Sequence, residues 1–163
     1  MKIRPFQDTD AAFCFRVRSR AFIQKFYGEL TPQEVTTAVN SYLPEDYLRM
    51  ARETTFFIVE QDGTPIGFFN LKQMDQSTAE LPLIYLDLDH LGRGIGAACL
   101  DYIEKWLLEN WSEVNTLIVD TIIPKYNCGF YLKVGFEPRE STYCEFSGQK
   151  IKALRLVKKL MKN

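Results

Sequence analysis

The stretch LDHLGRGIGAACLDYIEKWL, Leu88 to Leu107, places three glycines at the start of an amphipathic helix: Gly92, Gly94 and Gly96. Glycine costs about 1 kcal/mol relative to alanine inside a helix. Three glycines here therefore indicate a backbone that must adopt a conformation, or allow an approach, that a side chain would prevent. Apolar residues follow at helical spacing, which predicts a helix with one buried face. Two explanations fit the glycines: peptide N–H groups that hold a phosphate, or a tight turn without a ligand.

Two known phosphate-binding patterns were tested against this stretch. A Walker loop needs Gly-Lys followed by Ser or Thr, and that pattern is missing from the sequence. The dinucleotide fingerprint G-x-G-x-x-G/A is matched by Gly92, Gly94 and Ala97, with Asp120 near the end of the next apolar run. However, the upstream strands pair as hairpins, and too little chain follows to build a parallel sheet. Dinucleotide binding therefore remains an alternative that the neighbouring predicted strands do not support.

The order of periodic segments predicts an α+β fold, with a mixed, mainly antiparallel sheet flanked by helices. Asp62-Gly63 lies between two β-rich runs and indicates a hairpin. Thr31, Pro32 and Glu34 predict a capped helix start. The expected strands are 2–6, 54–61, 64–72, 80–88, 115–123, 142–146 and 151–160, and the expected helices are 8–28, 32–43, 45–53, 95–107 and 127–134.

Composition limits the class of protein. The chain has 163 residues, 46% hydrophobic and 25% charged, with a net charge of −1. This suits one globular domain over residues 1–163 and gives no reason to expect a nucleic-acid partner. Without a long apolar run or a signal peptide, a membrane partner is not expected, and the expected location is cytoplasmic. Four scattered cysteines and the single His90 make a metal site improbable and predict buried thiols.

Two phrases of the sequence resemble the GCN5-related N-acetyltransferase (GNAT) family. They are LIYLDLDHLGRGIGAACL, residues 83–100, and FYLKVGF, residues 130–136. In that family the pattern R/Q-x-x-G-x-G/A binds the pyrophosphate of acetyl-coenzyme A. The resemblance implies an acyl-CoA N-acyltransferase-like fold, acetyl-CoA as cosubstrate, and a possible homodimer. One departure is clear: Leu91 occupies the Arg/Gln position, so a side-chain contact to the coenzyme is lost or the register differs.

The resemblance also implies the residues that handle the coenzyme and the chemistry. Glu80, or a water, is expected to act as base, with Asp87 and Asp89 as weaker alternatives. Tyr131 is expected to act as general acid toward the coenzyme sulfur; its plain alternative is a core aromatic. Asn127 lies one helical turn before Tyr131 and is a candidate to hydrogen-bond the coenzyme arm, although the family's usual asparagine lies further upstream, where this chain has Pro124. The expected coenzyme-binding residues are Leu86, Asp87, Leu88, Leu91, Gly92, Arg93, Gly94, Ile95, Gly96, Ala97, Asn127 and Tyr131.

The acceptor is expected to be the primary amine of a small molecule or a peptide. In this fold the first two helices and the last strands build the acceptor pocket, and here Tyr27, Glu29 and Tyr42 are the candidate contacts. Acids mixed with aromatics suit a cationic amine, although a solvated helix surface explains them equally well.

A second hypothesis is a coenzyme-binding module that transfers nothing and serves as a sensor or subunit. Leu91 keeps this hypothesis open, whereas Glu80 and Tyr131 favour an enzyme. The two differ in turnover: a silent module binds acetyl-CoA but releases no thiol with any amine.

Overall fold

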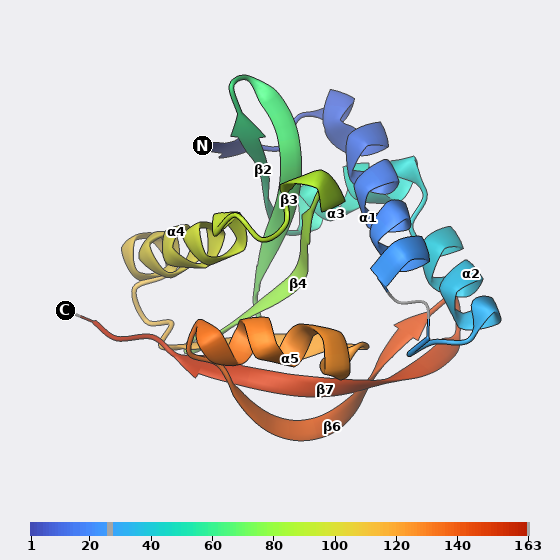
Figure 1. The fold of residues 1–163 in the computed structure, drawn as a ribbon. Coiled ribbons are helices and arrows are strands. Elements are labelled where there is room, and N and C mark those ends of the chain that lie inside the picture. The colour runs from blue at the N-terminus through green and yellow to red at the C-terminus, as the bar shows by residue number, and fades with distance from the viewer. Residues whose placement is uncertain (26–27, 163) are drawn as a thin grey trace.

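The computed structural model describes residues 1–25 and 28–162 (Figure 1). Seven strands form one sheet in the order β1-β2-β3-β4-β5-β7-β6, and only β4 and β5 pair in parallel. The mainly antiparallel, helix-flanked α+β fold is therefore confirmed. The strands are β1 Lys2–Pro5, β2 Thr55–Gln61, β3 Thr64–Gln73, β4 Thr78–Leu86, β5 Thr116–Thr121, β6 Glu137–Phe146 and β7 Gln149–Lys159.

Helices cover both faces of this sheet (Figure 1). The helices are α1 Ala11–Lys25, α2 Pro32–Asn40, α3 Pro44–Glu53, α4 Ile95–Asn110 and α5 Pro124–Lys133, with short 3-10 turns at Asp8–Asp10 and Leu88–His90. The predicted capping box is confirmed, because Thr31 and Glu34 exchange side-chain to backbone hydrogen bonds. No helix in the described part of the chain has the length and apolar character needed to cross a membrane.

Alternation along the central strands divides the core between the two helical layers. Phe57 and Phe69 join the cluster that contains the buried face of α4, whereas Phe56 and Phe68 join the cluster formed by α1 and α3. Successive strand side chains point to opposite faces, so one strand serves both layers. Because both faces are covered, these strands read as continuous apolar runs in the sequence.

An irregularity in β4 opens the sheet at its centre. Lys72 pairs with Glu80 and Asn70 pairs with Leu83, so β4 carries one extra residue at this bulge. Pro82 lies in the bulge and has no N–H to donate to a neighbouring strand. The parallel pairing of β4 with β5 covers only 78–80 against 116–118. Beyond Glu80 the two strands separate, and the space between them becomes the site described below.

Several predicted boundaries need correction. The strand expected to reach Leu88 ends at Leu86, since Leu88 lies in a 3-10 turn that links β4 to the glycine stretch. The strand expected from 142 begins at Glu137, because a long ladder with β7 outweighs its mostly polar sequence. Of the expected buried thiols, Cys14 and Cys99 are buried, whereas Cys128 and Cys144 are only partly buried, and Cys144 lines the cavity described below.

Candidate active site

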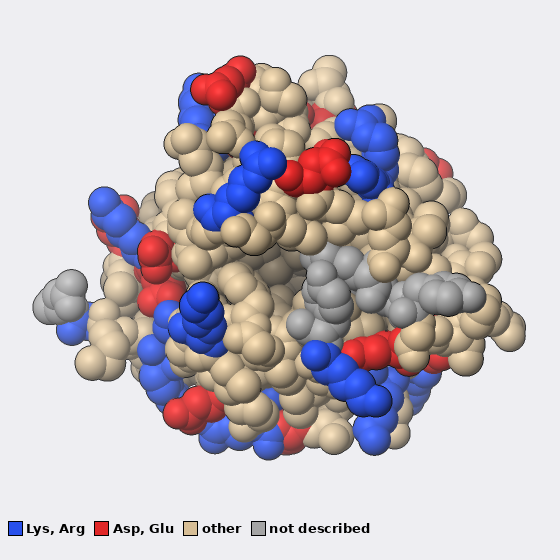
Figure 2. Space-filling model, in the orientation of Figure 1, with Lys and Arg blue, Asp and Glu red and all other residues tan. Residues whose placement is uncertain are grey.

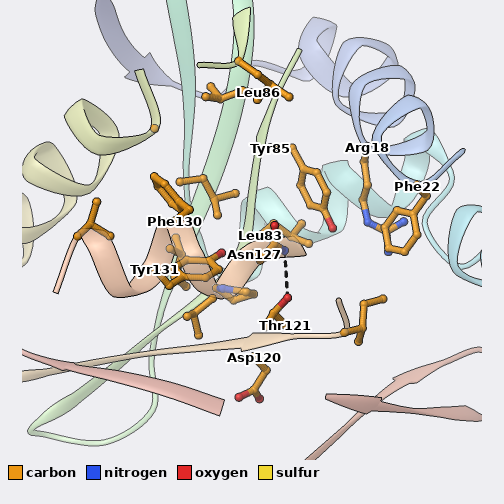
Figure 3. Close-up of a pocket in the computed structure, with 18 of the residues that line it drawn as sticks. Arg18, Phe22, Leu83, Tyr85, Leu86, Asp120, Thr121, Asn127, Phe130 and Tyr131 are labelled. Carbon is orange, nitrogen blue, oxygen red and sulfur yellow. Dashed lines mark hydrogen bonds between the residues drawn. The ribbon is translucent and has the colours of Figure 1, made fainter. Parts of the chain in front are cut away.

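The site is a cavity of about 790 Å³ where β4 and β5 separate. Its walls come from α1, β4, the glycine stretch, the start of α4, β5, α5 and β6. Figure 2 shows the hollow near the middle of this face, and Figure 3 shows side chains from these elements converging on it. This one space therefore joins segments that are far apart in the sequence.

The glycine stretch needs glycine for its own backbone. Gly92 and Gly94 have φ angles of 74° and 77°, in the left-handed region that favours glycine. Gly96 is needed for packing instead, since a Cβ there would lie 3.1 Å from the Phe130 ring of α5. Backbone conformation and packing therefore explain the three glycines without a ligand.

The same geometry leaves a place for an anion. Gly94 is the N-cap of α4, and within the described residues no side chain caps the N–H groups of the first turn. Those N–H groups have no partner inside the helix, and the helix dipole adds partial positive charge. Gly94, Ile95, Gly96 and Ala97 all line the cavity. A phosphate group placed here would be held by backbone donors.

Nine of the twelve residues expected to bind coenzyme line the cavity, and three do not. Arg93 is exposed, and Leu88 lies in the 3-10 turn. The Asp87 N–H donates to the Ile66 carbonyl at 2.7 Å, so it is not available to a ligand. Those in the lining are Leu86, Leu91, Gly92, Gly94, Ile95, Gly96, Ala97, Asn127 and Tyr131.

The backbone of β4 offers hydrogen-bonding groups toward the cavity. In an antiparallel pair, residues bonded to the partner strand alternate with residues whose N–H and C=O groups face away. Because Asp87 bonds to Ile66 of β3, the N–H and C=O groups of Ile84 and Leu86 face the gap beside β5. Of the expected coenzyme-binding residues Leu86, Asp87 and Leu88, only Leu86 has peptide groups that face the gap, and Ile84, two residues earlier on the strand, joins it.

The alternative bases Asp87 and Asp89 already have a partner. Arg20 of α1 lies 2.7 Å from an Asp87 oxygen and 3.3 Å from an Asp89 oxygen. Neither aspartate lines the cavity. Asp87 and Asp89 instead tie α1 to the turn after β4. Glu80 therefore remains the candidate base.

Glu80 is half-buried in the cavity wall. Burial raises the pKa of its carboxyl, and the charge of Asp120 raises it further, while Lys72 and Arg155 act in the opposite direction. Asp120 itself is held by Arg155 through two hydrogen bonds of 2.9 Å. Glu80 has no hydrogen bond or ion pair of this kind among the described residues. It is therefore a carboxylate with free acceptor positions and a pKa above the ordinary glutamate range.

Tyr131 is buried in α5 and faces the same cavity. Its ring contacts Phe130 and Phe136 with centroids 5.3 and 5.4 Å apart, and burial raises the pKa of its phenol. Tyr131 therefore packs as a core aromatic and also lines the cavity, as a general acid would have to. Tyr85, which sequence reasoning passed over, projects from β4 toward the middle of the cavity, as Tyr131 does from α5 (Figure 3).

Asn127 lines the cavity one helical turn before Tyr131. Its Nδ2 donates to Thr121 Oγ1 at 3.0 Å, across the start of α5 (Figure 3). This contact ties α5 to the end of β5 and leaves the Asn127 side-chain carbonyl available. His90, also in the lining, has a buried Nδ1 without a partner among the described residues.

The acceptor end differs most from expectation. Tyr42 lines the cavity, Glu29 does not, and Tyr27 lies outside the described residues. In place of an acidic lining, this end holds Arg18 of α1, which is 1% exposed and is surrounded by aromatic rings. Sequence reasoning missed Arg18. A signal was present, since Arg18 lies one residue after the apolar Val17 and one helical turn before Phe22, close to the buried face.

A model of the acetyltransferase (GNAT) family matches residues 20–136. The chain belongs to this family of acyl-CoA-dependent N-acetyltransferases. An uncharacterized N-acetyltransferase of Methanocaldococcus jannaschii is 29% identical over 102 residues, 58% of this chain and 44% of that protein. The chain thus spans less than half the length of that curated relative.

Solved structures share the fold. A GCN5-related N-acetyltransferase of Rhodopseudomonas palustris superimposes with a TM-score of 0.83 at 19% identity, covering 98% of this chain and 95% of that one. PaiA N-acetyltransferase of Thermoplasma acidophilum, solved in complex with coenzyme A, gives 0.80 at 21% identity, covering 97% and 98%. The family match and the single parallel strand pair do not fit the parallel sheet of a dinucleotide-binding fold.

Proposed function

We propose that the protein transfers the acetyl group of acetyl-CoA to a primary amine, with both substrates bound in the cavity between β4 and β5. The observation that carries this proposal is the lining of that cavity. The uncapped N-terminus of α4, the carboxylate of Glu80 and the phenol of Tyr131 all face it. It rests also on membership of an acetyltransferase family.

The coenzyme would enter along the split between β4 and β5. Its pyrophosphate fits the N–H groups at Gly94 to Ala97, where a helix N-terminus and glycines with positive φ allow close approach. The pantetheine arm fits beside the outward-facing peptide groups of Ile84 and Leu86. Peptide groups supply these contacts, so they do not depend on the missing Arg/Gln side chain at Leu91.

Glu80, directly or through water, is proposed to take a proton from the acceptor. A protonated amine has no lone pair, so its ammonium proton must leave before the nitrogen can attack the thioester carbonyl carbon. A carboxyl with a raised pKa binds that proton better than an ordinary glutamate does. The new C–N bond then forms, the carbonyl π electrons move to the oxygen of the tetrahedral intermediate, and the attacking nitrogen, now cationic, loses its second proton to solvent.

Tyr131 is proposed to protonate the leaving sulfur. When the intermediate collapses, the C–S bond breaks and the electron pair goes to sulfur, which needs a proton to depart as a thiol. The buried surroundings that raise the phenol pKa also make a thiolate more basic; burial raises the pKa of the cavity thiol Cys144 to about 11. A thiolate that departs into these surroundings is therefore a stronger base than in water, which favours its protonation by a nearby donor.

The proposal is tested by titrating the protein with acetyl-CoA and then following thiol release with a panel of amines. Saturable acetyl-CoA binding with amine-dependent thiol release supports it. Binding without thiol release, across small amines and peptide amines, would overturn it in favour of a silent coenzyme-binding module. No binding of acetyl-CoA at millimolar concentration would overturn both.

A further inference from the structure

Arg18 lies at the end of the cavity away from the glycine stretch, and it is a buried cation with unused donors. Its Nη1 donates to the Ala38 carbonyl in the last turn of α2 at 2.8 Å. Its Nε is buried and has no hydrogen-bond partner among the described residues. A guanidinium carries five N–H donors, so the Ala38 carbonyl and the nearby phenols of Tyr47 and Tyr85 leave part of its capacity unused, the Nε–H included.

Aromatic rings, rather than acids, surround this guanidinium. Its central carbon lies 4.3 Å from the Tyr42 ring centroid, 4.4 Å from that of Phe22 and 5.6 Å from that of Phe146. Within the described part of the chain no carboxylate forms an ion pair with it. Rings offset part of the cost of burying a charge, and the phenols of Tyr47 and Tyr85 also interact with the guanidinium, but none of these groups carries the negative charge that would balance it.

Charge is divided between different walls of the cavity. Arg18 projects from α1, and Asp120 lies on β5, on another side of the cavity (Figure 3). Glu80 of β4 also lines the cavity, and it pairs with Ile118 of β5. Asp120 is paired with Arg155, and the lining residues Lys133 and Glu145 are exposed. Among the described residues, Glu80 and Arg18 are therefore the charged lining side chains that are at least partly buried and have no ion-pair partner. A ligand that carries both an ammonium and a carboxylate complements this arrangement.

We infer that the acceptor is an amino acid, whose carboxylate binds Arg18 while its amine lies toward Glu80. The inference rests on the proposed function and names its substrate class. A carboxylate matches the fork of guanidinium donors, and in a site shielded by aromatic rings such a pair is strong. The rings of Phe22, Tyr42 and Phe146 suit an acceptor whose carbon skeleton is apolar. This replaces the expectation of an acidic pocket for a purely cationic amine.

The test compares amino acids with their amides, which lack the negative charge. Leucine, phenylalanine, β-alanine and γ-aminobutyrate, each with its amide, are titrated into the protein saturated with CoA, and thiol release from acetyl-CoA is then measured with the same compounds. The variants are Arg18→Met, which keeps the stem, and Arg4→Met as a control. Arg4 forms its ion pairs with Asp10 and Glu60 on β1 and β2 and lies outside the cavity lining.

Loss of a charge-assisted pair costs roughly 10- to 100-fold in affinity. We expect at least one free acid to bind that much more tightly than its amide to the wild-type protein, and Arg18→Met to remove the difference. Arg4→Met lowers thermal stability but keeps the preference. CoA binding to Arg18→Met at wild-type affinity shows that the variant is folded.

The outcomes separate this inference from the proposed function. Arg18-dependent preference for a free acid over its amide, in both binding and thiol release, supports the inference. Selective, Arg18-dependent binding of acids without thiol release from any of them overturns the inference that they are acceptors, and it leaves Arg18 as a carboxylate site only. Thiol release with amines that is equal for acids and amides, or equally reduced for both by Arg18→Met, overturns the inference and leaves acetyl transfer intact. If no acid in the panel binds better than its amide, the inference is also overturned.

Discussion

The two ends of the cavity are built by different means. The donor end, around Gly92 to Ala97, presents backbone N–H groups from one continuous stretch at the start of α4. The acceptor end presents side chains from α1, β4 and β6, with Arg18 at its centre. One end is made by backbone conformation, the other by the meeting of distant segments.

This difference explains how one fold can serve many acceptors. Backbone donors are insensitive to most side-chain changes, so the donor end can stay constant while the acceptor end changes residue by residue. The proposed base Glu80 and the proposed acid Tyr131 come from β4 and α5. Substitutions should therefore separate into those that affect the chemistry, the coenzyme and the acceptor.

The largest effect is expected at the proposed base, from Glu80→Gln. Removing a general base typically costs 100- to 10,000-fold, and we expect kcat/KM to fall roughly 1,000-fold. In the wild-type protein, activity falls as the pH drops through the raised pKa of Glu80, and this acidic limb should disappear in the variant. The measurement is thiol release as a function of pH, and wild-type turnover by Glu80→Gln would assign proton removal to water alone.

The same variant should not lose stability. A carboxyl whose pKa is raised by folding stabilises the native state when it is protonated, and this contribution is lost as the pH rises through the folded-state pKa. At neutral pH the ionised Glu80 therefore costs stability that glutamine does not. Thermal unfolding should show Glu80→Gln equal to or above wild type at pH 7, with the difference shrinking toward low pH. A clear loss at pH 7 would contradict the stated cause of the shift.

The second largest effect is expected at the donor end, from Gly94→Asp. Asp tolerates the left-handed conformation better than most residues, and a Cβ at Gly94 meets nothing within 4 Å. The fold should survive while the new charge repels the pyrophosphate, weakening acetyl-CoA binding roughly 100-fold. Gly94→Asn is the matched neutral control and should lose far less. Equal losses for both variants, measured by calorimetry, would mean that backbone strain and not charge is responsible.

How much the sequence predicts follows this same division. The glycine stretch, the Asp62-Gly63 hairpin and the capped start of α2 are local, and each was predicted because its signal lies within a few residues. Arg18 could not be found in this way, because its surroundings are formed by Ala38, Tyr42 and Phe146, which are distant in the sequence. Asp87 shows the reverse error: its position in the motif pointed to the coenzyme, but its N–H and carboxylate are used by Ile66 and Arg20.

A smaller effect should distinguish Tyr85 and Tyr131, the two tyrosines that line the cavity from β4 and α5. Tyr131→Phe removes the proposed acid, and because a hydrogen bond to a developing charge contributes about 1.5–3 kcal/mol, kcat should fall roughly 10- to 100-fold with little change in acetyl-CoA affinity. Tyr85→Phe is the matched control on β4, since its ring stacks on Phe68 and is retained in the variant. If Tyr85→Phe is the more damaging change in a single-turnover thiol assay, the acid is Tyr85.

The smallest effect concerns Leu91, the position that holds Arg or Gln in related sequences. Leu91 is half-buried and lines the cavity beside the glycines, so a longer polar side chain there has access to the bound phosphates. Leu91→Arg should tighten acetyl-CoA binding roughly 5-fold at low salt, because a surface-accessible ion pair contributes about 1 kcal/mol and is screened by salt. Leu91→Met, which adds length without charge, should leave the affinity unchanged. A gain that persists at high salt would point to packing, whereas a loss with Arg would show that the backbone donors already fill the pyrophosphate site and that Leu91 belongs to its wall.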